Sequence, residues 1–261
     1  MFDKFDKKNS LFFDFNEGGG DLYFDRITGK RGSIRDGTIT RVNNEHGKAL
    51  NFVNTLNTIS VDQLYAPSSG AGFTVAGRLK PSEFNPNDKR WFIYGNPSDD
   101  DDYGIRIDFN LASSEGQPRA RIQIASSVTE VVFTGDTWVD DDSGIIAVTY
   151  DGATLRLYTW LDDGTFVQGS TSASGIVDTA STWITVIGGD PVAAAEYEGD
   201  ISWVLTVPQG LTLKDVKCLI DWADRTKKGT EVDSQEFLVP GLVPGVASVV
   251  IYSRMLTGIG V

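Results

Sequence analysis

The sequence predicts an all-β protein, a two-sheet antiparallel sandwich with one short helix. Three observations on the 261-residue chain lead to this prediction: apolar and polar residues alternate along short segments, tight-turn dipeptides separate these segments, and helical spacing occurs once. Alternation with a period of two gives a strand one buried face and one exposed face. Many short strands between turns are typical of antiparallel sandwiches, which at this length often form a single domain.

The alternation is clearest in three segments, 104–109, 119–125 and 155–161. We expect their apolar phase to face the core: Ile105, Ile107, Phe109, Ile122, Ile124, Leu155, Leu157 and Leu161. We expect their polar phase to face outward: Arg106, Asp108, Arg121, Gln123, Arg156, Tyr158 and Trp160. The remaining strand-like stretches place four tryptophans in the core: Trp91, Trp138, Trp183 and Trp203.

Turn signals separate the segments at short intervals. Asp-Gly pairs occur at 151–152 and 163–164, a Gly-Gly pair at 188–189, and a Pro-Gln-Gly run at 208–210. Asp-Gly supplies the positive φ that a tight hairpin needs. The spacing of these turns therefore predicts hairpins between neighbouring strands.

One helix is predicted after Thr212, which can serve as its N-cap with Asp215 in the position of a capping box. Apolar residues then recur at helical spacing, and a glycine at 229 offers a stop. The single cysteine, Cys218, lies within this stretch and has no partner for an intrachain disulfide. A lone cysteine is usually a small buried apolar residue, and we expect it to be buried.

Seven segments in a fixed order carry a family resemblance: 11–20, 25–32, 47–52, 73–81, 145–166, 184–189 and 197–205. This order resembles laminin-G-like and pentraxin-like domains of the concanavalin A-like jelly-roll superfamily. The resemblance implies a jelly roll over residues 11–216, preceded by an extension at 1–10. Residues 217–261 would add the C-terminal helix, a Pro/Gly loop and an extra or closing strand.

The end of the chain holds two candidates for the family's closing strand. The segments 201–212 and 249–257 both resemble it, so the second one either closes the sandwich or adds an edge strand or arm. Between them, 238–245 is apolar and punctuated by Pro and Gly, which excludes a helix or a central strand. Such a segment either packs on its own domain or docks on a neighbouring subunit.

Composition excludes some classes of partner. The net charge of −13 and the lack of a basic stripe argue against nucleic acid, and no apolar stretch is long enough to insert into a membrane. The start, 1–10, has lysines but no apolar segment after them, so we expect no signal peptide. Since laminin-G-like modules generally act outside cells, a chain without a signal suggests display on a virion surface, for instance that of a phage.

Motifs for catalysis are not found, and we expect no enzyme activity. The superfamily's retaining hydrolases carry Glu-x-Asp-x-x-Glu on one strand, and the acidic strings at 195–200 and 233–237 have the wrong spacing. The family's lyases use a Gln-x-His strand, but the single histidine, His46, has no glutamine two positions earlier. We expect His46 to be a surface turn residue. A carbohydrate-active enzyme with an unrecognised site stays as an alternative.

Calcium is the candidate cofactor that the resemblance implies, because domains of this kind often hold Ca²⁺ at a loop rim. Two acidic runs could supply oxygen ligands, 140–142 and the run Asp99, Asp100, Asp101 and Asp102. Neither forms an EF-hand loop, and a run of charges can equally be a solvated loop tip.

The outward residues of the three alternating segments form the candidate ligand site. If their strands neighbour one another in one sheet, Arg106, Asp108, Arg121, Gln123, Arg156, Tyr158 and Trp160 would share one platform. Aromatic faces stack on sugar rings, and Arg, Asp and Gln hydrogen-bond to hydroxyls. The alternative is a polar sheet surface with cross-strand pairs.

These observations together predict a non-catalytic binding and display module. We expect a head decoration, fibre or tail adhesin of a virion that contacts surface polysaccharide, with other virion subunits or copies of itself as partners. The alternative is a purely structural virion protein that locks neighbouring subunits together.

Overall fold

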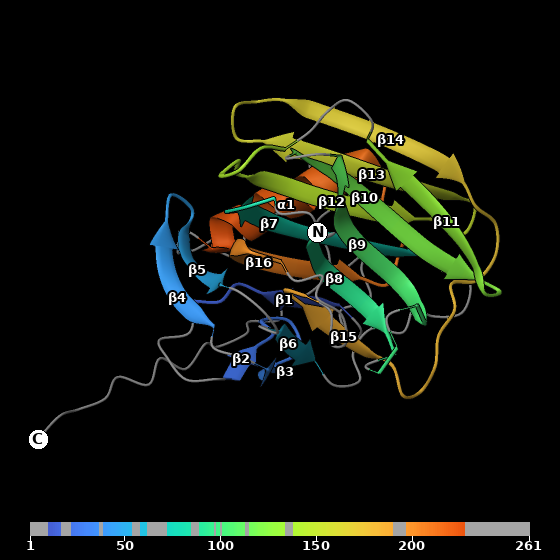
Figure 1. Cartoon of the computed structure of the whole chain (residues 1–261), viewed down its shortest axis with the longest axis horizontal. Coiled ribbons are helices and arrows are strands. Elements are labelled where there is room, and N and C mark those ends of the chain that lie inside the picture. Colours follow the sequence, from blue (N-terminus) through green and yellow to red (C-terminus); the bar gives the residue numbers. More distant parts are fainter. Residues whose placement is uncertain are drawn as a thin grey trace, which may run out of the picture.

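The computed structural model describes residues 10–16, 22–36, 39–53, 58–61, 72–84, 89–96, 98–99, 101–112, 115–133, 138–189 and 197–227. Over these residues the chain forms two sheets of antiparallel strands and one helix. The two sheets pack face to face (Figure 1). The predicted two-sheet antiparallel sandwich is therefore confirmed.

The first sheet, sheet A, has the strand order β14-β13-β12-β7-β16-β5-β4, and β1 also pairs with β16. Its strands are β1 (Leu11–Phe13), β4 (Thr40–Asn44), β5 (Gly47–Phe52), β7 (Phe73–Pro81), β12 (Gly144–Tyr150), β13 (Thr154–Leu161), β14 (Phe166–Ser172) and β16 (Gly199–Val207). Strands far apart in sequence, such as β7 and β16, are direct neighbours, as a jelly roll requires.

The second sheet, sheet B, has the order β11-β10-β9-β8-β15-β6-β3-β2. Its strands are β2 (Leu22–Phe24), β3 (Arg31–Asp36), β6 (Thr58–Val61), β8 (Lys89–Gly95), β9 (Tyr103–Ala112), β10 (Glu115–Ile124), β11 (Ser127–Val132) and β15 (Ile184–Ile187). Strands β8 to β11 follow one another as hairpins, so residues on the same phase of these four strands share one face.

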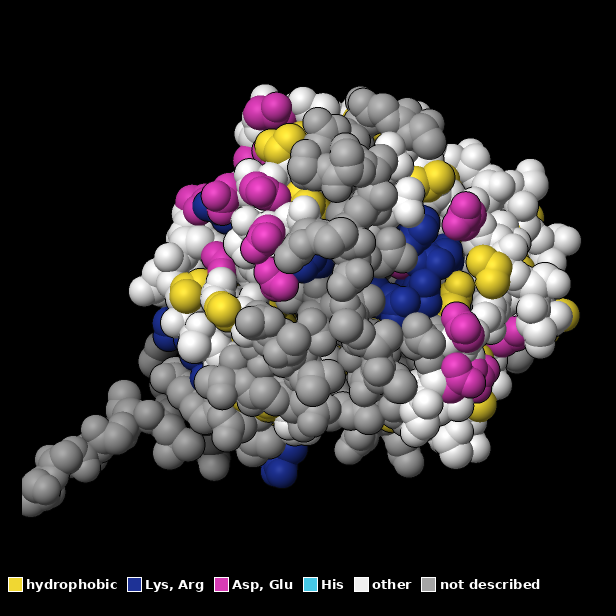
Figure 2. Space-filling view, in the orientation of Figure 1, with side chains coloured by type: hydrophobic (Ala, Val, Ile, Leu, Met, Phe, Trp, Pro, Cys, Tyr) yellow, Lys and Arg dark blue, Asp and Glu magenta, His cyan; other side chains and the backbone are white. Residues whose placement is uncertain are grey.

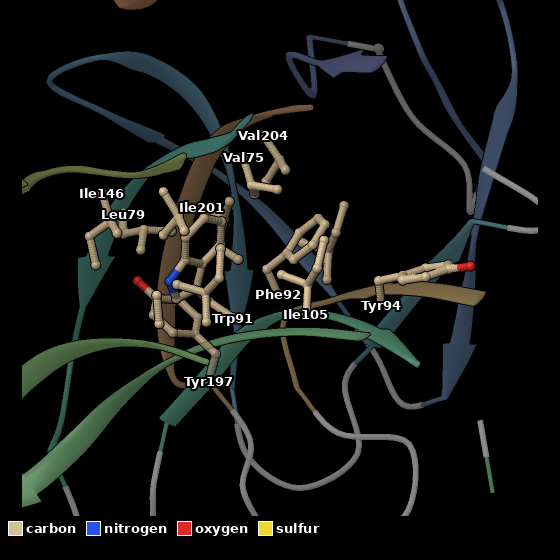
Figure 3. Packing of buried hydrophobic residues seen from close by; sticks show 14 of the residues in the cluster. Val75, Leu79, Trp91, Phe92, Tyr94, Ile105, Ile146, Tyr197, Ile201 and Val204 are labelled. Carbon is tan, nitrogen blue, oxygen red and sulfur yellow. The ribbon is translucent and has the colours of Figure 1, made fainter. Parts of the chain in front are cut away.

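The main core lies between the sheets, and Figure 3 shows part of it. Trp91 of β8 reaches across to sheet A, where a Cβ on Gly77 of β7 would come within 2.7 Å of the indole ring. A glycine at this position therefore makes room for the tryptophan. The apolar phases of all three alternating segments face this core, and the four expected tryptophans are buried, as predicted.

The helix α1 (Leu213–Lys227) covers part of the outer face of sheet A. The Thr212 hydroxyl accepts from the Asp215 amide at 3.3 Å and donates to the Asp215 carboxylate at 2.6 Å, which confirms the predicted cap. Val216 packs with other buried helix residues on the outer side chains of β12, β13 and β16. These helix and sheet residues form a second buried cluster, outside the main core. Tyr158, expected to face solvent, is only 4% exposed, because its ring lies in this cluster.

Cys218 is exposed on the helix, so the expectation of a buried cysteine was wrong. Residues 216, 219, 220 and 223 form the buried face of α1, and 218 lies on the other side of the helix at 100° per residue. The apolar residues at helical spacing mark the covered face, and Cys218 lies outside their phase.

Of the two candidate closing segments, the first contributes β16, which lies between β7 and β5 inside sheet A. The segments 238–245 and 249–257 lie outside the described residues. The helix in the described part of the chain is neither long nor apolar enough to span a membrane.

Candidate functional site

The seven outward residues predicted from sequence fall into two groups on different sheets. Arg106 and Asp108 lie on β9, and Arg121 and Gln123 lie on the adjacent strand β10 of sheet B. The other three, Arg156, Tyr158 and Trp160, lie on β13 of sheet A. The outer faces of the two sheets point away from each other, so the single shared platform was a wrong prediction.

On sheet B, the structure collects four arginines around one carboxylate, and we call these residues the arginine cluster: Arg90, Arg106, Arg119, Arg121 and Asp108. Strand register brings them together. Arg90 of β8 and Arg119 of β10 flank Asp108 on either side, and Arg121 lies opposite Arg106. Figure 2 shows a dark-blue basic patch over this part of sheet B.

Asp108 is fully buried at the centre of the arginine cluster. The Nε of Arg119 donates to its Oδ1 at 2.7 Å, the Nε of Arg106 donates to its Oδ2 at 3.2 Å, and Arg121 also donates to Oδ2. Burial alone would raise the pKa of Asp108, but the hydrogen bonds and positive charges of Arg119 and Arg121 outweigh it and hold the pKa below its usual value.

The positive charges of the cluster also act on one another. Burial, followed by the charges of Arg90 and Arg121, lowers the pKa of Arg106. The Arg106 guanidinium lies over the Tyr103 ring, 5.0 Å from its centroid, which is an additional attractive contact. Gln123 belongs to a different interaction, because its Nε2 donates to the Asp101 carbonyl at 2.6 Å.

On sheet A, β13 and β14 present two neighbouring rings that we call the aromatic strip, Trp160 and Phe166, whereas Tyr158 beside Trp160 is buried. Trp160 and Phe166 are cross-strand partners, with ring centroids 5.1 Å apart and planes at 28°. Phe166 is 38% exposed. The same register places Gln168 opposite Tyr158 and Ser170 opposite Arg156, both exposed on the edge strand.

The acidic run between β8 and β9 forms a turn. The Asp99 Oδ1 accepts from the Asp101 amide at 3.1 Å, and the Asp102 Oδ2 accepts from the Asn96 Nδ2 at 3.0 Å. Asp100 lies outside the described residues. The carboxylates of Asp99 and Asp102 thus take part in local hydrogen bonds. Binding of Ca²⁺ stays a prediction, tested by the effect of Ca²⁺ and EDTA on the melting temperature.

The second acidic run, 140–142, is also engaged in local structure. The Asp140 carboxylate accepts from the Phe84 amide at 2.7 Å, and the Asp142 carboxylate accepts from the Val139 amide at 2.7 Å. These bonds fix the approach to β12.

His46 lies in the turn between β4 and β5, as expected, but its ring is drawn into a polar network. Its Nε2 lies 2.8 Å from Asp162 Oδ2, 3.2 Å from Ser143 Oγ and 3.1 Å from a nitrogen of Arg78. A serine-histidine-aspartate triad needs the serine and the aspartate on different ring nitrogens. Here both contact the same nitrogen, so this arrangement cannot pass a proton between them.

Glu45, His46 and Asp162 also bring three possible metal-ligand atoms within 4.8 Å of one another. Arg78 donates to Asp162 at 2.7 Å, and its positive guanidinium lies against both His46 and Asp162. A cation placed there would face that charge at close range. We therefore interpret the group as a structural network that joins two turns to β7.

A family model described as the concanavalin A-like lectin/glucanases superfamily, of the laminin-G type, matches residues 54–217. The chain therefore belongs to this superfamily, and its described strands form the jelly roll expected of it. No curated protein sequence matches the chain.

Solved structures show the same fold at low sequence identity. The binding domain of botulinum neurotoxin DC in complex with SialylT superposes with a TM-score of 0.59 at 11% identity, covering 83% of this chain and 52% of that one. A Trypanosoma rangeli sialidase in complex with sialic acid gives 0.56 at 15% identity, covering 80% and 32%. The receptor-binding domain of botulinum neurotoxin D gives 0.55 at 12% identity, covering 83% and 53%. The chain thus spans about half or less of each neighbour.

Two residues of these surfaces escaped the sequence reasoning although a signal existed. Arg119 lies two positions before Arg121 and so shares its strand face. Phe166 follows the Asp163-Gly164 turn, and folding a hairpin about that turn would have placed it opposite Trp160. Arg90 gave no such signal, because a bulge between Arg90 and Phe92 breaks the alternation of β8.

Proposed function

We propose that the chain is a non-catalytic glycan-binding module whose aromatic strip contacts the sugar. The observation that carries this proposal is the cross-strand pair of Trp160 and Phe166, two stacked aromatic rings at the surface of the outer face of sheet A. Sugar rings bind to aromatic faces through their apolar C–H surfaces.

The polar neighbours of the strip suit the same ligand. Gln168 and Ser170 are exposed on β14 beside the rings, and an amide and a hydroxyl can each donate to and accept from sugar hydroxyls. The Arg156 guanidinium adds a donor, held by Asp151 at 2.6 Å. The strip therefore combines stacking surface and hydrogen-bonding groups within one hairpin.

Neighbouring structures support a sugar ligand. Two of them hold a ligand named as SialylT or sialic acid, and the superfamily includes lectins.

We further propose that this module is part of a virion, as a decoration, fibre or tail component. Its support is the sequence expectation together with the apolar Pro/Gly segment 238–245, whose composition suits docking on another subunit. A purely structural virion protein is the alternative. Proteomic analysis of purified particles tests whether the chain is a virion component at all. Glycan binding then separates a glycan-binding component from a purely structural one.

A glycan array with the full chain tests the proposed site. Phe166→Ala removes a ring that is 38% exposed and should abolish binding of the preferred glycan, and its melting temperature establishes that the variant stays folded. Phe24→Ala is the matched control, since Phe24 is 39% exposed on β2 of sheet B. Binding that survives Phe166→Ala and Trp160→Ala alike would contradict the proposed site, and an array with no binding at all would contradict the function.

A further inference from the structure

We infer that Lys217 of helix α1 makes the aromatic strip selective for an anionic glycan, by pairing with a carboxylate or sulfate group that the glycan carries. The inference rests on the proposed function, because it uses the same strip. It deepens that function by assigning the charge of the ligand and the residue that recognises this charge.

The first step is the position of Lys217. Its Nζ lies 5.1 Å from the centroid of the Phe166 ring, so a cation from the helix meets the exposed end of the aromatic strip. The packing of α1 fixes this arrangement, because Val216 and Leu219 are buried against sheet A and Trp160 packs against the same helix–sheet cluster. Lys217 itself is exposed. The ammonium group is therefore open to solvent beside the two rings.

The second step is that the charge of Lys217 is not neutralised. Among the described residues no carboxylate forms an ion pair with it, and its contact with Phe166 is a cation–π interaction, which leaves the positive charge in place. Asp221 lies one helical turn further on, but a lysine that precedes the acid is the less favourable orientation for a pair within a helix. Arg156, by contrast, is already bound to Asp151. Lys217 is therefore a cation with which a bound ligand can pair.

The third step is the class of ligand. A sugar that packs against Phe166 brings its substituents within reach of a flexible side chain whose ammonium group already lies at this ring. An ammonium group is a point charge with three donors, so a carboxylate and a sulfate can each pair with it. A densely charged polyanion would be repelled by a chain of net charge −13, so a glycan with a single anionic group suits the site better.

The test compares the affinities of the full chain for charged and neutral probes in two series. The first is sialyllactose and sulfated lactose against lactose, and the second is oligogalacturonate against its neutral methyl ester. We expect the charged members to bind more tightly by about three- to fivefold, the range of a single exposed ion pair, and this ratio to fall as salt is added. Within the lactose series, the tighter of the two charged probes shows which anionic group the site prefers.

Three variants assign the preference to one side chain. Lys217→Met keeps a side chain of similar length without the charge, so the ratio of charged to neutral affinities should fall close to one. Lys217→Arg should retain the preference, because a guanidinium also pairs with either anion. Lys214→Gln is the matched control, since Lys214 is exposed one turn earlier on α1 and has no ring contact in the described structure. Melting temperatures establish that the three variants fold.

Three results would overturn the inference: equal affinities of the wild type for charged and neutral members, no binding in either series, or equal effects of Lys217→Met and Lys214→Gln on the ratio. The proposed function fails separately. Binding of neutral glycans that is lost in Phe166→Ala supports the aromatic strip whether or not charged probes are preferred, whereas a glycan array without any binding contradicts the function itself.

Discussion

Arg78 of β7 donates to both carboxylate oxygens of Asp224 on helix α1: its Nε lies 3.0 Å from Oδ1, and a terminal nitrogen lies 2.6 Å from Oδ2. The same Oδ1 accepts from the indole nitrogen of Trp203 at 2.8 Å. The Asp224 carboxylate therefore links α1 to both β7 and β16 of sheet A.

Asp224→Ala should lower the free energy of unfolding by about 2–4 kcal/mol, because it leaves the Arg78 charge and the Trp203 N–H in a largely buried position without this acceptor. Urea unfolding measures this loss. Asp221→Ala, at an exposed position on the same helix, is the control and should change stability by less than about 0.5 kcal/mol.

Gly77→Ala should destabilise the protein by about 1–3 kcal/mol, because the new Cβ would come within 2.7 Å of the Trp91 ring. Trp91→Phe should relieve the clash, since a phenyl ring is smaller than an indole. A double-mutant cycle should therefore show that the two substitutions cost less together than the sum of their separate effects. Strict additivity would contradict this packing.

Acid should remove the stability that Asp108 contributes. Because the folded-state pKa of Asp108 is lowered, its contribution is complete above the unfolded-state pKa of about 3.9 and is lost as pH falls through the folded pKa. Asp108→Asn should thus be less stable than the wild type at pH 7 and should lose less stability between pH 5 and the acid limit. If the free energy of unfolding falls equally with pH in the two proteins, Asp108 does not contribute to this acid dependence.

Local patterns in the sequence predicted which residues face the core, and long-range pairing decided the rest. The period of two correctly placed Ile105, Ile107 and Phe109 inside and Arg106 and Asp108 on the other face. It carried no information about which strands share a sheet. Because β9 and β10 joined one sheet and β13 the other, the predicted platform divided into two surfaces.

The packing of a helix on one face of a sheet explains a second kind of error. Tyr158 lies on the outward phase of β13, but α1 covers that face of sheet A, so the ring is buried. Cys218 shows the converse, since it lies on the helix face turned away from the sheet. A helix can be predicted from its cap and spacing, whereas the surface it covers depends on the packing of the whole domain.

The most direct test of the central claim is a crystal structure of the full chain with the glycan that the array selects. The account predicts a sugar ring packed against Trp160 and Phe166, with hydroxyls hydrogen-bonded to Gln168 or Ser170. A neutral glycan bound elsewhere on the domain, with the aromatic strip left open to solvent, would contradict it.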